Sequence, residues 1–427
     1  MSKDKLALRG GNPTIDYSFK KYISIESEEV EAAKRVVETG TLSDFLGKWH
    51  EKFYGGENVR KFENNWSSFF KVKDTITFNS ATSALCAAIG ACQIGPGDEV
   101  IVSPYTMAAT ATSIISYNAI PVFADIDDET FNMTPESIIE KITHNTRAIL
   151  IPSIMGHPAR LDEIIKIAKE YNLKVIEDAC QAPTAMLNGK YAGTYGDIGV
   201  FSLNKHKHIQ TGEGGIAITN SPELGERLRL IRNHGEVTAD SRGIKNLVNT
   251  FGFNFRMGEI EAAIGIEQLK KLQGLVDKRV ETMNYLTDRL KPFEEYIETP
   301  AIRDNCTHVY YLYAMKYKRK EGMPSREKIV EALCAEGFPV RDGFQKPLYL
   351  LSMFQNRIAY GDKGCPFACP LYKGSVSYEE GTCPTVEKIE KNSMITFHVE
   401  HVDLNNKDID LIAAACNKVF SNISEIE

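Results

Sequence analysis

The sequence predicts an α/β protein with a large domain built on a mostly parallel sheet and a smaller C-terminal α+β domain. Two observations lead to this fold class. Between residues 75 and 176, short β-rich apolar runs alternate with segments of helical pattern, as in strands joined by crossover helices. After Pro300 the chain changes to tyrosine-rich strand and mixed segments that end in a helix at 408–421. Ligands of such parallel sheets bind at the carboxyl ends of the strands, so we expect the site there.

The elements follow in order along the chain. The first helix is expected at 27–40, with Ser27 as its cap, an apolar stripe that includes Val30 and Val37, and Gly40 as its stop. A polar loop follows at 41–56. The strands expected next are 75–78, 100–103, 120–124, 148–151 and 174–176, and the helices are 82–93, 108–118, 135–142 and 161–171. Strands and helices in this alternation give a sheet that is covered on both faces.

The domain boundary is expected in a long helix. A charge-rich, helix-favouring stretch covers 258–291, and a boundary near residue 280 gives a large domain with an N-terminal arm at 1–280 and a small domain at 281–427. Residues 361–381 contain two glycine-proline-cysteine clusters without periodicity. This segment is predicted to be an insertion loop on the small domain.

Composition excludes several classes of protein. The net charge is −7, with 50 Lys+Arg against 57 Asp+Glu and no basic block, which argues against a nucleic-acid partner. No signal peptide or membrane-spanning run is visible, so a cytoplasmic protein without membrane contact is expected. The nine cysteines are scattered except for Cys365, Cys369 and Cys383, whose spacing matches no standard zinc pattern. No metal site is therefore predicted.

Lys207 is the first candidate for chemistry. It lies in the run Lys205-His206-Lys207-His208, which is followed by a glycine-rich stretch at 211–215. A neutral lysine amine can attack a carbonyl, and glycines let the backbone approach a ligand. His206 and His208 are expected to be structural, since alternate residues of an extended segment point to opposite sides. The alternative is that the one sharing the lysine's face helps to bind a substrate oxygen or phosphate. A solvated basic loop is the alternative interpretation.

Asp178 follows an apolar strand and is expected at its carboxyl end. A carboxylate in that position can keep the pyridine nitrogen of pyridoxal phosphate protonated, which makes the ring an electron sink. Gln181, three residues further on, is within reach of the phenolic oxygen of the ring. A helix cap is the alternative role for Asp178.

The segment 79–85 joins a strand to a helix through small residues. Free backbone N–H groups at a helix start, the helix dipole and hydroxyls such as that of Thr82 can hold a phosphate group. Ser202, five residues before Lys207, offers a second hydroxyl. An ordinary Ser/Thr helix cap is the alternative.

A lysine, a carboxylate and a phosphate cradle occur together in one α/β frame, and their order and spacing match those of a known family. From about Leu6 to the C-terminus, the chain resembles the pyridoxal-phosphate-dependent sugar aminotransferases of the DegT/DnrJ/EryC1/StrS type, which have fold type I, close to aspartate aminotransferase. The motifs that carry this resemblance lie at 42–43, 55–56, 79–85, 95–100, 177–181, 196–202, 207, 211–215, 233–235 and 252–257.

The resemblance implies the roles of the site residues. Lys207 is the catalytic lysine that binds the cofactor as a Schiff base, and an asparagine at the position of Asn254 reaches the phosphate from the neighbouring subunit. The site would therefore be shared across a homodimer. The residues implied to bind pyridoxal 5′-phosphate are Ala81, Thr82, Met107, Asp178, Gln181, Ser202, Lys207 and Asn254.

Two of these positions depart from the family pattern. Met107 stands where the family usually has an aromatic residue that stacks on the cofactor ring, although a thioether can also cover a ring. Ala81 stands where many members have glycine, and its methyl group is tolerated only if φ is negative.

The resemblance implies a transamination in two halves. L-glutamate, or else L-glutamine, gives its amino group to the cofactor, which passes it to a keto or aldehyde sugar. Met107 and the segment 361–381 favour an 8-oxo-3,8-dideoxy-octulosonate acceptor, as in lipopolysaccharide biosynthesis, over a nucleotide-linked keto-hexose or a keto-inositol. Two further alternatives are a pyridoxamine-dependent sugar dehydratase, in which histidine replaces the lysine, and a non-enzymatic sensor.

Overall fold

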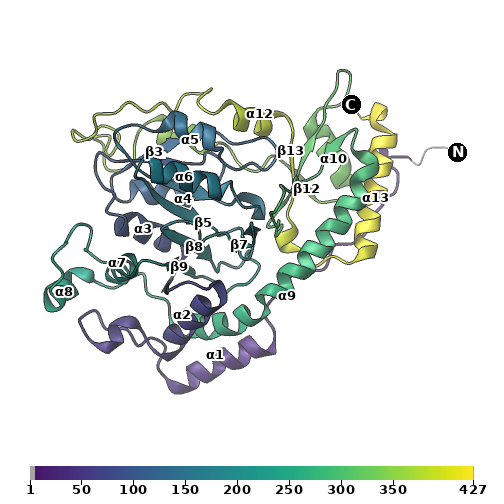
Figure 1. The fold of residues 1–427 in the computed structure, drawn as a ribbon. Coiled ribbons are helices and arrows are strands. Elements are labelled where there is room, and N and C mark those ends of the chain that lie inside the picture. The colour runs from purple at the N-terminus through teal and green to yellow at the C-terminus, as the bar shows by residue number, and fades with distance from the viewer. Residues whose placement is uncertain (1–4, 427) are drawn as a thin grey trace.

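The structure, a computed structural model, describes residues 5–426 (Figure 1). It contains two main hydrophobic cores. A seven-stranded sheet organises the larger core, in the order β1-β9-β8-β5-β4-β2-β3. β9 runs antiparallel to β1 and β8, and the other neighbours are parallel. The strands are β1 (Asp74–Phe78), β2 (Glu99–Val102), β3 (Ile120–Phe123), β4 (Thr146–Pro152), β5 (Lys174–Asp178), β8 (Ile198–Ser202) and β9 (Gly215–Thr219). The predicted α/β class is confirmed.

Helices cover both faces of this sheet, and local chemistry sets their ends. Ser80 accepts a hydrogen bond from the Ser83 N–H at the start of α3, and Thr134 with Pro135 starts α5. The strands and helices predicted between residues 75 and 176 are present, with ends that differ by up to three residues. The helices of this part are α1 (Ser27–Thr39), α2 (Glu57–Phe70), α3 (Ala81–Ala91), α4 (Ala108–Ile115), α5 (Pro135–Lys141), α6 (Leu161–Glu170), α7 (Pro222–Arg232) and α8 (Gly235–Ala239).

The predictions for α1 were wrong in two details. Glu26, and not Ser27, is the N-cap, because it forms a capping box with the first turn. Val30 and Val37 are more than half exposed. The helix packs against α9 through the side that carries Val36, so the two valines lie outside its buried face.

The long helix α9 (Glu259–Leu290) connects the two cores. Val276 belongs to the first core and Met283 to the second. The second core contains an antiparallel sheet in the order β10-β11-β13-β12, packed with α10 and α13. Its elements are β10 (Ile297–Glu298), β11 (Tyr313–Tyr317), β12 (Val340–Asp342), β13 (Met394–Phe397), α10 (Arg326–Ala335) and α13 (Asn406–Ser421). We propose the change of core within α9 as the domain boundary.

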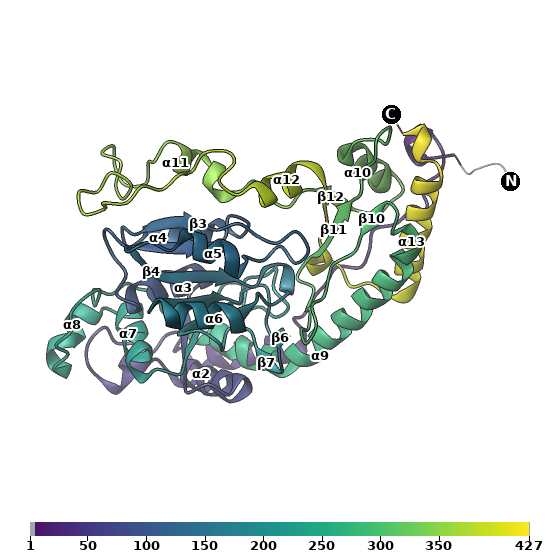
Figure 2. The ribbon, with the colours of Figure 1, turned by 45° about the horizontal axis from the view of Figure 1, so that its top comes forward.

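Residues 344–383, here called the strap, correct the prediction for 361–381. The segment does not lie on the small domain but runs across the large one, between β12 and α12 (Pro384–Asn392) and through α11 (Ser352–Gln355) (Figure 2). The Tyr360 hydroxyl donates to the Ile115 carbonyl, and the Tyr378 hydroxyl donates to the Pro121 carbonyl, both at 2.8 Å. The aromatic residues of the strap require an apolar surface, and the edge strand β3 provides one.

A small hairpin of β6 (Met186–Leu187) and β7 (Lys190–Tyr191) completes the strands. Glu177 of β5 anchors the turn that follows this hairpin, because its carboxylate accepts three backbone hydrogen bonds of 2.6 Å from residues 193–196. Between residues 5 and 426, no helix combines the length and the apolar character needed to cross a bilayer.

Candidate active site

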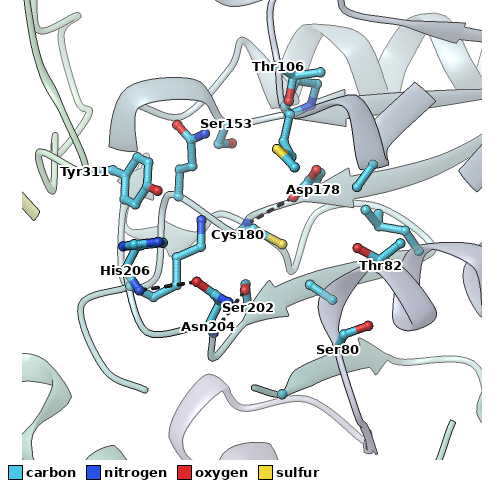
Figure 3. A pocket seen from close by; sticks show the side chains of 18 of the residues that line it. Ser80, Thr82, Thr106, Ser153, Asp178, Cys180, Ser202, Asn204, His206 and Tyr311 are labelled. Atoms are coloured by element: carbon cyan, nitrogen blue, oxygen red, sulfur yellow. Dashed lines mark hydrogen bonds between the residues drawn. The ribbon is translucent and has the colours of Figure 1, made fainter. Parts of the chain in front are cut away.

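A cavity of about 360 Å³ lies at the carboxyl ends of β5 and β8 (Figure 3). Ser80 and Thr82 lie on one side of it, and His206 and Tyr311 lie on the other. Seven of the eight residues predicted from the sequence line this cavity, namely Ala81, Thr82, Met107, Asp178, Gln181, Ser202 and Lys207. Only Asn254 does not.

Lys207 is held in an ordered loop that connects β8 to β9. Backbone hydrogen bonds join Leu203 to Gly214 (2.9 Å) and Lys205 to Gly212 (3.1 Å) across the loop. The Lys207 amine lies 4.2 Å from the centre of the Tyr311 ring, a cation–π contact inside the cavity. The alternative of a solvated basic loop therefore does not fit this lysine.

The two histidines beside the lysine differ in their surroundings. His208 is fully buried, and its Nε2 lies 2.9 Å from the Val309 carbonyl. Burial holds the pKa of His208 well below its ordinary value. His206 lines the cavity instead, and its pKa is lowered by burial and by the neighbouring His401. His208 is thus a structural residue, whereas His206 faces the site.

Asp178 is a buried carboxylate with an incomplete set of partners. It is 7% exposed, it accepts a 2.8 Å hydrogen bond from the Thr110 hydroxyl, and it accepts one of 3.2 Å from the Cys180 N–H. No helix begins directly after it, because the next element is the strand β6, and this excludes the helix-cap alternative. In the described part of the chain, no lysine, arginine or histidine forms an ion pair with Asp178. A buried carboxylate without a cation suits a protonated pyridine nitrogen.

A backbone hydrogen bond orients the side chain of Gln181. Its Oε1 accepts a 2.8 Å hydrogen bond from the Met155 N–H. The carboxamide can then present its nitrogen, a donor, to the cavity that it lines. A donor at this place is the group that the phenolic oxygen of the cofactor requires.

The first turn of α3 forms a cradle suited to a phosphate. The Ser80 side chain takes the Ser83 N–H at 3.1 Å, while helix geometry leaves the N–H groups of Ala81 and Thr82 without intrahelical acceptors. A Cβ on Gly215 would lie 2.4 Å from the Ser80 backbone, so only glycine lets β9 approach this turn so closely. Ser202 accepts a 3.3 Å hydrogen bond from Asn204 and keeps its own proton for a ligand.

The two departures from the family pattern also have defined positions. Met107 is the N-cap residue of α4, is 62% exposed and lines the cavity. Ala81 lies in α3 and is absent from the residues with positive φ. Its methyl group therefore causes no backbone strain.

Asn254 lies outside the cavity of its own chain. It is exposed, and its Oδ1 accepts a 2.7 Å hydrogen bond from the Arg256 guanidinium. Several exposed apolar residues lie near it in the sequence: Leu247, Val248, Phe251 and Phe253. Asn254 therefore does not line this cavity in its own chain, although its carbonyl accepts a 3.4 Å hydrogen bond from the Asn79 side chain.

Sequence reasoning missed two residues of the site. Thr110, which binds Asp178, lies one helical turn after Met107, and this spacing was the only signal for it. Tyr311 reaches the cavity because its N–H binds the Met155 carbonyl at 2.8 Å, far away in the sequence. No local pattern reveals such a contact.

Comparisons with known proteins agree with this geometry. The profile of the DegT/DnrJ/EryC1/StrS aminotransferase family matches residues 36–396. The GDP-perosamine synthase of Caulobacter vibrioides is 32% identical over 86% of this chain and 91% of its own. The L-glutamine:2-deoxy-scyllo-inosose aminotransferase of Streptoalloteichus tenebrarius is 29% identical over 99% of both chains.

A solved structure confirms the fold. The aminotransferase of Psychrobacter cryohalolentis superposes with a TM-score of 0.82 at 28% identity, over 95% of this chain and 100% of its own. The family profile and the cavity therefore identify the same class of protein. The chain belongs to the DegT/DnrJ/EryC1/StrS family of sugar aminotransferases, enzymes that use pyridoxal 5′-phosphate as their cofactor.

Proposed function

We propose that this enzyme transfers the amino group of L-glutamate or L-glutamine to a keto or aldehyde group of a sugar or cyclitol. The observation that carries the proposal is one cavity containing Lys207, the unpaired carboxylate of Asp178 and the free first turn of α3. These three features supply the nucleophile, the ring partner and the phosphate cradle that such chemistry needs.

The residues of the cavity fit pyridoxal phosphate. When bound, the cofactor supplies a cationic ring that withdraws electrons from the amine-bearing carbon of the donor. Asp178 would hold the ring nitrogen and Gln181 the phenolic oxygen. Ala81, Thr82 and Ser202 would hold the phosphate, and Met107 would cover the ring.

Lys207 would then act as the proton carrier. Its Nζ would take the proton from the Cα of the donor and deliver it to the carbon on the other side of the transferred nitrogen. The Tyr311 ring, 4.2 Å away, holds the amine in position beside the cavity. When the acceptor is bound, the same lysine moves the proton in the reverse direction.

The dehydratase alternative requires histidine in place of the lysine. Here Lys207 and His206 line the cavity, whereas His208 is buried against Val309. The position at which a dehydratase would have histidine is thus occupied by Lys207, which disfavours this alternative. The sensor alternative is also disfavoured, because Lys207, Asp178 and Ser202 all line the cavity.

For the acceptor, we propose a ketone on a six-membered carbohydrate ring. The inosose aminotransferase spans 99% of both chains, and the perosamine synthase spans 86% of this one. Neither name refers to an octulosonate, so the octulosonate hypothesis is kept only as one of the acceptors to be tested.

For the location, we propose the cytoplasm. All nine cysteines are free thiols, which fits a reducing compartment such as the cytoplasm.

We also propose a homodimer with a shared site. The exposed position of Asn254, and the exposed Phe251 and Phe253 beside it, fit a surface covered by a second copy. In that arrangement Asn254 would complete the phosphate cradle of the neighbouring subunit.

The acceptor proposal is tested by supplying glutamate or glutamine with three acceptors: 2-deoxy-scyllo-inosose, a GDP-linked 4-keto-6-deoxyhexose and the 8-oxo-octulosonate. We expect mass spectrometry to find an amine on a ring ketone. Lys207→Ala should remove the activity, because it removes the proton carrier. Lys205→Ala, on an exposed lysine of the same loop, should retain it. Amination of the octulosonate alone would overturn the acceptor assignment, and an active Lys207→Ala would overturn the mechanism.

Thr110→Val should weaken cofactor binding about 10- to 100-fold, since a hydrogen bond to a charged group contributes about 1.5–3 kcal/mol. The loss should appear in the dissociation constant of pyridoxal phosphate, measured by absorbance. Thr112→Val, on the same helix but without a hydrogen bond to Asp178, is the matched control. Equal dissociation constants of pyridoxal phosphate in the two variants would show that Thr110 does not support cofactor binding through Asp178.

Mixed dimers test the shared site. Lys207→Ala and Asn254→Ala homodimers should each be inactive or nearly so. After the subunits are exchanged, activity should return to about a quarter of the wild-type value, because half of the dimers are hybrids and each hybrid has one intact site. If mixing restores no activity although hybrids form, Asn254 does not act across the interface.

A further inference from the structure

A second group of ligating side chains lies beside the active-site cavity. His398, Glu400 and His401 follow β13, and their potential ligand atoms all lie within 4.8 Å of one another. Glu400 Oε1 is 2.7 Å from His398 Nδ1 and 3.4 Å from His401 Nε2. Among residues 5–426, this is the only group of three or more such side chains, so the three cysteines at 365–383 do not form one.

The second oxygen of Glu400 is an independent sign of a missing partner. The residue is 6% exposed, and its Oε2 is buried without any hydrogen bond. A buried carboxylate oxygen left in this state is destabilising, because nothing replaces the water that it has lost. The buried guanidinium of Arg279 interacts electrostatically with Glu400. In the described residues, however, no ion pair within 4.0 Å joins the two side chains.

The set of donors indicates the class of ion. Two imidazoles and one carboxylate suit zinc and similar transition-series ions, whereas magnesium and calcium prefer oxygen ligands only. Three protein ligands leave at least one coordination position open. Each nitrogen must give up its contact with Glu400 or share it with the ion, a shift that the half-exposed His401 allows.

The cluster is linked to the cavity through His206. The rings of His206 and His401 pack edge to face, with centroids 5.1 Å apart, and His206 lines the cavity. His206 belongs to the loop of Lys207, and His401 follows a strand of the small domain. An ion at the cluster would therefore lie where the two domains meet at the edge of the site.

We propose that His398, Glu400 and His401 bind one divalent ion of the zinc class at this edge of the active-site cavity. The competing explanation is a closed network in which Glu400 only orients two imidazoles. The two differ in one measurable property, because the closed network binds no ion.

Holoenzyme without a histidine tag, dialysed free of metal and of unbound cofactor, is titrated with Zn²⁺ or Co²⁺ in the absence of donor and acceptor. We expect one ion per chain by elemental analysis, and a visible Co²⁺ spectrum typical of nitrogen and oxygen ligands. Glu400→Gln and His401→Ala should each weaken binding at least about tenfold, as the loss of even an outer partner does at known sites. His144→Ala, on an exposed histidine outside the cluster, should leave it unchanged.

His401→Ala keeps the test valid if Glu400→Gln fails to fold, because His401 is half exposed. Absence of saturable binding to the folded wild-type enzyme would overturn the proposal. Binding that survives unchanged in His401→Ala would overturn it as well. Since no substrate is present, neither result depends on the proposed aminotransfer.

Discussion

The site depends on one electrostatic constraint, the carboxylate of Asp178, which is buried at the end of β5 and forms no ion pair with a cationic side chain among residues 5–426. Removing an ionised carboxylate from water is costly unless partners replace the water, and here Thr110 and the Cys180 N–H replace only part of it. The parallel strands around β5 place this charge at the floor of a cavity. A protonated ring nitrogen bound to it would complete the set of partners. In the proposed function, the other cofactor contacts of the cavity would position that ring.

The walls of the cavity come from segments that are far apart in the sequence, and a few backbone contacts join them. The Met155 N–H orients Gln181, and the Met155 carbonyl accepts the N–H of Tyr311. Gly215 brings β9 against the first turn of α3. Through these contacts, the lysine loop, the phosphate cradle and the link to the small domain keep a fixed arrangement. The strap stabilises the opposite edge of the sheet by covering β3.

Features governed by local chemistry could be predicted from the sequence. The alternating strands and helices, Asp178 at a strand end and Thr82 at a helix start all follow from neighbouring residues, and the structure places them as expected. Contacts through space could not be predicted in this way. Residues 361–381 of the strap were assigned to the wrong domain, because the sequence pattern of the segment does not indicate which surface its aromatic residues pack against. Thr110, Tyr311 and the pairing of His206 with His401 could not be predicted either, because each depends on a partner far away in the sequence.

The central claim is that Lys207 is the residue that carries the cofactor. Reduction of the holoenzyme with borohydride, followed by peptide mass spectrometry, tests this most directly, because it fixes the cofactor covalently to the amine that holds it. The account predicts the reduced cofactor on Lys207 alone. Its attachment to Lys205 or to another lysine, or no attachment in a protein saturated with pyridoxal phosphate, would contradict the account.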